Sequence, residues 1–197
     1  GWVVRAAADG SGPVTGWQAQ SNSMAGVWAP PGPVISSSGD VWISTGNSEV
    51  LIPDRTQWDG GNAVMRLTGD LSASTDHWVI SSWAALNNSD SDLGSFSPAL
   101  LPGGLVFASG KIGIGYLLRD SHLGGFGGEV FSDKACQTGG PTQGAFGGAA
   151  VAAGMVFVPC KDGLAALRVD TSVPSFSVAW HAAEGANSPV IAYGLVW

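Results

Sequence analysis

Short apolar runs separated by glycine-rich turns recur along this chain. The pattern Gly-x-Val-aromatic occurs at residues 39–42, 104–107, 154–157 and 194–197. Each copy follows a segment with small residues and often proline, at residues 32–35, 97–100, 148–151 and 188–191. Glycines in the turns tolerate positive φ, and the Val-aromatic pair that follows has a high strand propensity. Each copy therefore predicts a hairpin of two short strands.

Two further strands are predicted after the hairpins. A second turn, as at residues 109–111, leads into apolar segments at 116–119 and 164–167. The fourth strand often ends near a tryptophan, at Trp17, Trp78 and Trp180. Four short strands of this kind form one blade of a β-propeller, with a repeat of about 40–50 residues. The motif valines are 65, 50 and 40 residues apart, so the longer intervals contain insertions, the largest at residues 48–61.

The predicted fold is an all-β propeller of four-stranded antiparallel blades, with about four blades' worth of chain. The blade pieces are expected at residues 1–28, 29–93, 94–142, 143–186 and 187–197. The first piece looks like the outer strands of a blade, and the last looks like inner strands. The chain is therefore either part of a longer propeller or half of an eight-bladed ring in which two chains complete each other's split blade.

Composition agrees with strands joined by tight turns and argues against several classes of protein. Hydrophobic residues make up 45% of the 197 residues and charged residues 12%, with 30 glycines and 11 prolines, unlike a disordered chain or a helical bundle. The net charge of −7 and the lack of basic runs argue against nucleic-acid binding. Residues 135–160 carry no charge, but their prolines, glycines and polar residues indicate two buried strands and a turn rather than a transmembrane segment.

The two cysteines, Cys136 and Cys160, suggest one disulfide in an exported protein, with two unpaired thiols as the alternative. We expect a secreted, periplasmic or cell-surface location. No targeting segment is visible at residue 1, so any such segment lies outside the chain. The three histidines, His77, His122 and His181, lack the spacing of metal ligands.

Three segments carry a family resemblance. Ala7, Asp9 and Trp17 hold the first, third and eleventh positions of a motif that runs Ala-x-Asp/Lys-x-x-Thr-Gly-Lys-x-x-Trp. Residues 110–118 and 161–167 are similar to a Gly-Lys-Asp-Gly-x-x-Tyr-x-Leu turn and strand. In these features the chain resembles the pyrroloquinoline-quinone (PQQ) propeller repeat family, whose rings commonly have seven or eight blades. The resemblance implies that the motif tryptophans pack between adjacent blades.

The same resemblance indicates a candidate calcium site. Quinoprotein alcohol dehydrogenases of this family ligate calcium with the asparagine of a Thr-Gly-Asn turn, which makes Asn47 a candidate ligand. They place a catalytic aspartate near the position of Asp90 and Asp92, which also resemble part of an Asp-x-Asp-x-Gly calcium loop. The alternatives are an ordinary turn at Asn47 and a polar loop with Asx turns at residues 87–95. The family's adjacent Cys-Cys pair is absent, and no cationic residue follows in a convincing quinone-binding position.

Two main functional hypotheses follow, and neither assigns a catalytic residue from the sequence alone. The first is a non-catalytic, exported module that binds or scaffolds a protein, similar to the assembly-factor branch of the family, with no cofactor expected. Its partner would be another protein or a second copy of the chain, meeting the loops at residues 48–61 and 87–95. The alternative is a dehydrogenase dependent on PQQ and calcium. A third hypothesis is a structural calcium-binding repeat.

Overall fold

The chain folds into a succession of small antiparallel sheets. The computed structural model describes residues 1–21, 23–48, 57–138, 143–185 and 187–197. The first complete sheet contains β3 (Val34–Ile35), β4 (Val41–Ser44), β5 (Ala63–Leu67) and β6 (Ser74–Val79). The second contains β8 (Ala99–Leu101), β9 (Leu105–Ala108), β10 (Ile114–Arg119) and β12 (Phe131–Lys134). The third contains β14 (Ala150–Ala152), β15 (Met155–Cys160), β16 (Gly163–Asp170) and β17 (Ser175–Ala182).

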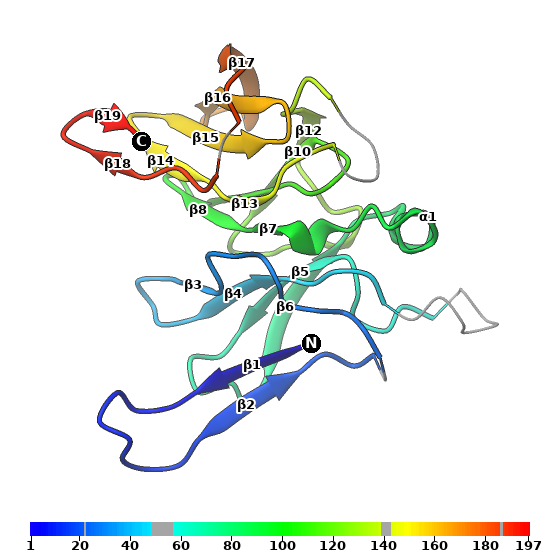
Figure 1. The fold of residues 1–197 in the computed structure, drawn as a ribbon. Helices are drawn as coiled ribbons and strands as arrows, with labels where there is room; N and C mark the ends of the chain where they lie inside the picture. The colour runs from blue at the N-terminus through cyan, green and yellow to red at the C-terminus, as the bar shows by residue number, and fades with distance from the viewer. Residues whose placement is uncertain (22, 49–56, 139–142, 186) are drawn as a thin grey trace.

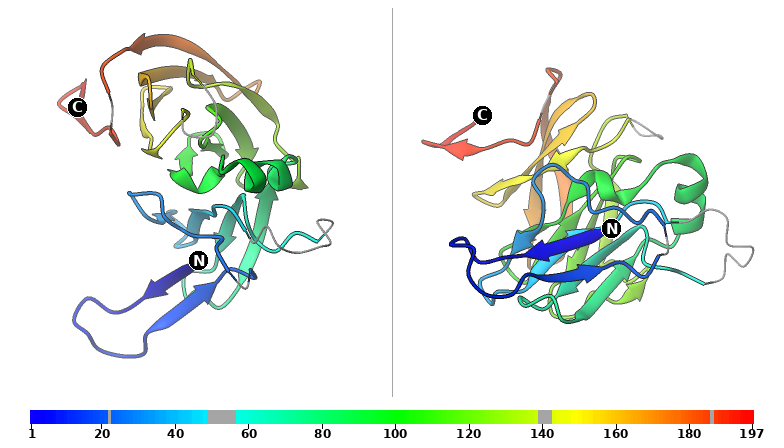
Figure 2. Two further views of the ribbon diagram at one scale, coloured as in Figure 1. Left: turned by 45° about the vertical axis from the view of Figure 1, so that its right-hand side comes forward. Right: turned by 60° about the horizontal axis from the view of Figure 1, so that its bottom comes forward.

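Two separate hairpins lie at the two ends of this succession (Figure 1). They are β1 (Trp2–Arg5) with β2 (Thr15–Gln18), and β18 (Ile191–Ala192) with β19 (Leu195–Val196). Figure 2 shows the sheets arranged in an arc, from the β1–β2 hairpin to the sheet of β14–β17. This arrangement confirms the predicted all-β propeller, with four-stranded antiparallel blades.

Short parallel pairings connect neighbouring blades. β11 (Gly125–Phe126) adds to the outer edge of the first sheet by pairing with β6. β13 (Gly147–Gly148) pairs with β7 (Phe96–Ser97), two segments that precede β14 and β8 respectively. Each pairing joins backbone groups of one blade to those of another, so the blades are connected by hydrogen bonds as well as by side chains.

The Gly-x-Val-aromatic pattern forms the second strand of each hairpin, as predicted. Ala153 and Gly154 both have positive φ, of 50° and 73°, and Tyr193 and Gly194 repeat this with 53° and 75°. Two successive residues with positive φ give the turn that matches the twist of a two-stranded ribbon. The motif valine then faces a leucine of the third strand in each complete sheet, as Val41–Leu67, Val106–Leu118 and Val156–Leu167.

The core lies between the sheets, where the apolar faces of adjacent blades meet. Trp78 on β6 is fully buried, and its ring centroid is 4.9 Å from that of Tyr116 on β10 of the next sheet. Trp17 on β2 is partly buried against the first sheet. Trp180 on β17 is 45% exposed and contacts Phe157 of its own sheet. A general docking role for the motif tryptophans therefore stays a prediction.

One segment departs from the predicted all-β pattern. The helix α1 (Trp83–Ser89) and the 3-10 turn η1 (Leu93–Ser95) occupy much of the region expected to be a polar loop. Helix-favouring residues at 84–86 begin α1, and buried Leu86 packs it against the blades. The helix ends at Ser89, and its C-cap Asp90 has a left-handed backbone (φ 50°), which turns the chain so that the Ser91 N–H donates to the Leu86 carbonyl at 3.0 Å. Residues 91–95 are then buried rather than available to a partner.

The predicted disulfide between Cys136 and Cys160 is present, with the two Cα atoms 5.6 Å apart. The uncharged segment supplies β13, β14 and β15, while its residues 139–142 lie outside the described part. No helix among the described residues is long and apolar enough to cross a membrane.

Candidate functional site

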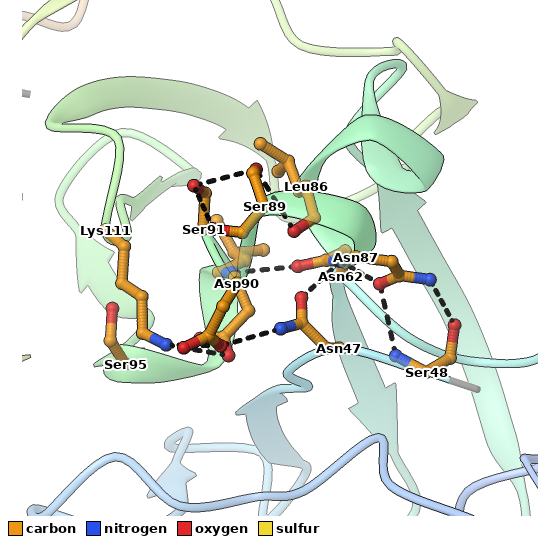
Figure 3. A network of polar contacts seen from close by, with 12 residues as sticks. Asn47, Ser48, Asn62, Leu86, Asn87, Ser89, Asp90, Ser91, Ser95 and Lys111 are labelled. Atoms are coloured by element: carbon orange, nitrogen blue, oxygen red, sulfur yellow. Dashed lines mark hydrogen bonds and ion pairs between the residues drawn. The ribbon is translucent and has the colours of Figure 1, made fainter. Parts of the chain in front are cut away.

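Three turns converge beside η1 and form the candidate site (Figure 3). They are the Thr45-Gly46-Asn47 turn after β4, the segment from Asp90 to Gly94, and the Gly110–Lys111 turn between β9 and β10. The backbones meet so closely that side chains are excluded. A Cβ on Gly94 would lie 2.5 Å from the Gly46 nitrogen, and a Cβ on Gly110 would lie 2.8 Å from the Asp92 carbonyl oxygen. These glycines therefore allow residues from two blades to share one site.

A buried lysine occupies the centre of the site. Lys111 Nζ donates to Asp90 Oδ1 at 2.9 Å and lies 3.3 Å from Asp92 Oδ2. The side chains of Lys111 and Asp92 are only 9% and 6% exposed, whereas that of Asp90 is 73% exposed. The ammonium also lies 5.4 Å from the ring centroid of Trp28, which is a cation–π distance. One cation thus compensates one buried and one exposed carboxylate.

Buried amides hold Asn47 beside this ion pair. Asn47 Nδ2 donates to Asp90 Oδ1 at 3.0 Å, and its Oδ1 accepts from Asn62 Nδ2 at 3.3 Å. Asn62 also donates to Asn87 Oδ1 at 2.7 Å and accepts from the Leu93 N–H at 2.9 Å. Asn87 in turn donates to Ser48 Oγ at 2.9 Å. Because each amide both donates and accepts, the network fixes the position of Asn47 relative to both carboxylates.

Burial affects the pKa values of both Asp92 and Lys111. Burial raises the pKa of Asp92, and the positive charge and hydrogen bond of Lys111 offset only part of that effect. Burial also lowers the pKa of Lys111, but the carboxylates of Asp90 and Asp92 outweigh it, so the pKa lies above its ordinary value. The lysine therefore stays charged at neutral pH. Asp92 Oδ1 is buried and has no hydrogen-bond partner among the described residues.

The three predicted calcium ligands, Asn47, Asp90 and Asp92, are brought together by the fold, but they do not fit a calcium ion as they stand. Calcium takes about 6–8 oxygen ligands at roughly 2.3–2.6 Å. Here one oxygen of each carboxylate already faces the Lys111 ammonium, and Asn47 turns its amide NH₂ toward Asp90. The Lys111 ammonium occupies the position beside the two carboxylates where a calcium ion would be attracted.

Sequence reasoning missed Asn62 and, at the centre of the site, Lys111. Its local sequence, Ser109-Gly110-Lys111, indicated only a turn residue. It lies 19 residues from Asp92 in sequence, and packing of the second blade against η1 brings the two together. The other predicted partner-binding loop, at residues 48–61, includes residues 49–56, which lie outside the described part of the chain.

Comparison with known proteins supports the fold. No model of a known protein family matches the sequence, and no curated protein matches it. The crystal structure of BamB from Moraxella catarrhalis resembles this structure with a TM-score of 0.52 at 12% sequence identity, covering 84% of this chain and 40% of that chain. The chain therefore spans less than half the length of BamB. The likeness shows a shared fold.

A second solved structure is also similar to this chain. Quinohemoprotein alcohol dehydrogenase from Comamonas testosteroni gives a TM-score of 0.48 at 15% identity, covering 76% of this chain and 20% of that chain.

Proposed function

We propose that this chain is a non-catalytic, PQQ-like propeller module that binds or scaffolds another protein. The observation that carries the proposal is the Lys111 ammonium between Asp90 and Asp92. A fixed internal cation supplies the charge compensation that a bound calcium ion would otherwise provide. The polar site then acts as a rigid connection between two blades, and no cofactor is required for it.

Exposed apolar side chains support a binding role. Trp2 and Val4 on β1 are each 64% exposed, while Leu195 and Trp197 at the C-terminal hairpin are 56% and 71% exposed. Large exposed apolar residues gathered on a few strands are typical of surfaces that a partner covers. A second copy of the chain is one protein partner that could cover these exposed side chains. Light scattering on the purified chain tests this, and a strictly monomeric protein across concentration would count against self-association.

Replacement of the lysine tests the central claim. In the wild-type protein we expect Ca²⁺ to leave the melting temperature unchanged, and PQQ with Ca²⁺ to give no dye reduction with alcohols. In Lys111→Met the carboxylates lose their cation, so Ca²⁺ should now raise the melting temperature. Lys134→Met, at an exposed position on β12, is the matched control and should show no response to Ca²⁺. A wild-type protein that gains stability from Ca²⁺ and reduces dye with PQQ would overturn the proposal.

The alternative, a dehydrogenase dependent on PQQ and calcium, rests on one specific observation. Asp92 Oδ1 is buried and makes no hydrogen bond of ordinary geometry among the described residues, although the Asn47 backbone N–H lies close enough to Asp92 to lower its pKa. A buried acceptor of this kind is costly unless some group satisfies it. In this alternative, calcium would have to displace the Lys111 ammonium from the carboxylates before Asn47 and Asp92 could hold the ion, and the quinone would supply the redox chemistry. The response of the wild-type protein to Ca²⁺ and PQQ, measured by melting temperature and dye reduction, distinguishes the two functions.

We further propose that the protein is exported, and the Cys136–Cys160 disulfide supports this. Disulfides persist in oxidising compartments and are rare in the cytosol. Alkylation of free thiols in freshly lysed producing cells, followed by mass spectrometry, tests the proposal. Two alkylated cysteines in the native host would contradict it.

A further inference from the structure

A second group of potential ligands lies away from the lysine site, around the disulfide. Cys136 follows β12, Cys160 ends β15, and Asp162 lies in the turn that leads into β16. The two sulfurs and a carboxylate oxygen of Asp162 all lie within 4.8 Å of one another. His181 on β17 lies outside this group of three but beside it, because its Nε2 lies 3.5 Å from Asp162 Oδ1. His181 lies two strands after Cys160 along the chain, so the spacing of these residues in the sequence did not reveal that they are close.

Two buried polar atoms here have only each other as a close partner. Asp162 Oδ1 and His181 Nε2 lie 3.5 Å apart, and neither makes a hydrogen bond to any of the described residues. The side chains of His181 and Asp162 are 10% and 17% exposed. The other carboxylate oxygen, Asp162 Oδ2, accepts from the Thr138 N–H at 2.7 Å. This backbone hydrogen bond orients Asp162 and leaves Oδ1 free to face the imidazole, as a supporting hydrogen bond orients a metal ligand.

We propose that, once the Cys136–Cys160 disulfide is reduced, the two thiolates, Asp162 and His181 bind one Zn²⁺ ion. Zinc prefers four sulfur, nitrogen and oxygen ligands in a tetrahedron, with Zn–S near 2.3 Å and Zn–N or Zn–O near 2.0–2.2 Å, so neighbouring ligand atoms lie about 3.4–3.8 Å apart. The distance of 3.5 Å between His181 Nε2 and Asp162 Oδ1 already fits this range.

The sulfurs reach the required separation when their bond is broken. The two cysteines are joined as a disulfide, on Cα atoms separated by 5.6 Å. Reduced sulfurs no longer share a bond, so they move apart by side-chain rotation toward the roughly 3.8 Å of two zinc-bound thiolates. The imidazole already lies beside Asp162, so in the proposed site it binds the same ion as the carboxylate.

With a dithiol as the reductant, the electrons and protons of the reduction and binding steps are all accounted for. The dithiol passes two electrons to the disulfide and becomes a disulfide itself, and its two protons go to the Cys136 and Cys160 sulfurs. Zn²⁺ then displaces both thiol protons into solvent as it binds the thiolates. The same two positions are thus cross-linked by a covalent bond when oxidised and by a metal ion when reduced. This inference does not depend on the proposed binding function.

Cobalt substitution tests the site directly. The full chain is reduced with a phosphine reductant under anaerobic conditions and titrated with Co²⁺, and the bound ion is then displaced by Zn²⁺. We expect one Co²⁺ per chain, with thiolate-to-cobalt charge-transfer absorption and the intense d–d bands of a tetrahedral ion. The oxidised protein should give neither signal. Reduced protein that binds no Co²⁺ overturns the proposal.

Variants separate a built site from two thiols that bind metal alone. His181→Ala and Asp162→Asn should each weaken Co²⁺ binding at least about ten-fold and alter the d–d bands. His122→Ala is the matched control, because His122 is 81% exposed and faces Asp76 elsewhere on the molecule. Unchanged affinity and spectra in both His181→Ala and Asp162→Asn would mean that only the cysteines bind, which overturns the proposal.

Thermal unfolding with and without Zn²⁺ tests the proposal even when reduction of the disulfide destabilises the fold. Zn²⁺ should raise the melting temperature of the reduced wild-type chain, or restore a cooperative transition, while having no such effect on reduced His181→Ala. A reduced wild-type chain that Zn²⁺ neither stabilises nor refolds contradicts the proposal. Oxidised His181→Ala, melted in parallel, shows whether the substitution itself damages the fold.

Discussion

The indole Nε1 of Trp78 donates a hydrogen bond of 2.8 Å to Glu129 Oε2, across the interface between two blades. Trp78 is fully buried on the last strand of one blade, and Glu129 lies in the segment before β12 of the next. The ring fills the apolar interface and its polar edge reaches a carboxylate at the rim. The contact therefore combines apolar burial with a charge-assisted hydrogen bond, which is stronger than a neutral one.

Replacement of Trp78 by phenylalanine should lower the free energy of unfolding by about 1–3 kcal/mol, because Glu129 loses its donor while most apolar contact remains. Urea denaturation followed by circular dichroism measures the loss. Trp180→Phe is the matched control, since Trp180 occupies the last strand of another blade but is 45% exposed. Its effect should be within about 0.5 kcal/mol. Equal losses in the two variants would contradict an inter-blade role for Trp78.

The close backbone contact of Gly94 with Gly46 gives a second prediction. Gly94→Ala places a methyl group 2.5 Å from the Gly46 nitrogen, where no flexible side chain can move aside. We expect a loss of at least about 2 kcal/mol in the free energy of unfolding, because the backbones of two blades must separate. Thermal and urea unfolding measure it. Gly185→Ala, whose added Cβ meets nothing within 4 Å, should leave stability almost unchanged. A tolerant Gly94→Ala variant would show that the site is not tightly packed.

The hairpins could be predicted from the sequence because a short local pattern produces them. The disulfide could be predicted because the chain has only two cysteines. A glycine turn followed by Val-aromatic forms a hairpin at each of its four positions in this chain, and two cysteines allow only one intramolecular pairing. The helix α1 was missed because its C-terminal residues, from Asn87 onward, favour turns in isolation. Packing of Leu86 between blades overrides that preference.

The centre of the candidate site could not be predicted for a different reason. Asn47, Asp90 and Asp92 were visible through motifs, yet the partner of both carboxylates is Lys111, which belongs to a turn of the next blade. The relative placement of two blades depends on the whole apolar interface between them and leaves no short sequence pattern. The approach of His181 to Asp162 has the same origin, since pairing of β16 with β17 brings them together.

The disulfide gives a third prediction. It closes a loop between residues separated by 24 positions, and chain-entropy arguments assign about 3 kcal/mol to a bridge over a loop of this size. The double variant Cys136→Ser with Cys160→Ser should therefore unfold with a free energy lower by about 3 kcal/mol in the presence of a chelator. Urea denaturation measures the difference, with the oxidised wild type as reference. Equal midpoints and slopes would mean that the bridge does not restrain the unfolded chain.

Asp70 provides a prediction of pH dependence with a defined sign. It lies in the turn between β5 and β6, where its Oδ1 accepts from Thr68 Oγ1 at 2.6 Å and from the Ser72 N–H at 3.0 Å. The hydrogen bond from Thr68, followed by those from Ser72, lowers the pKa of Asp70 to about 2. An unfolded aspartate has a pKa of about 3.9, so the folded state holds the ionised form in preference. The stabilisation is therefore complete well above about pH 3.9 and is lost as the pH falls towards about 2.

Asp70→Asn keeps an acceptor in the turn but cannot titrate there. The difference in urea midpoint between wild type and Asp70→Asn should therefore be largest near neutral pH and shrink as the pH is lowered through the window between about 3.9 and 2. Asp170→Asn should behave in the same direction, because Asp170 occupies the corresponding turn between β16 and β17, where the hydrogen bonds from Ser172 lower its pKa. NMR titration of the Asp70 carboxyl carbon measures the folded pKa independently. A difference in midpoint that does not change with pH would mean that these turns are stabilised by geometry alone, without a contribution from the carboxylate charge.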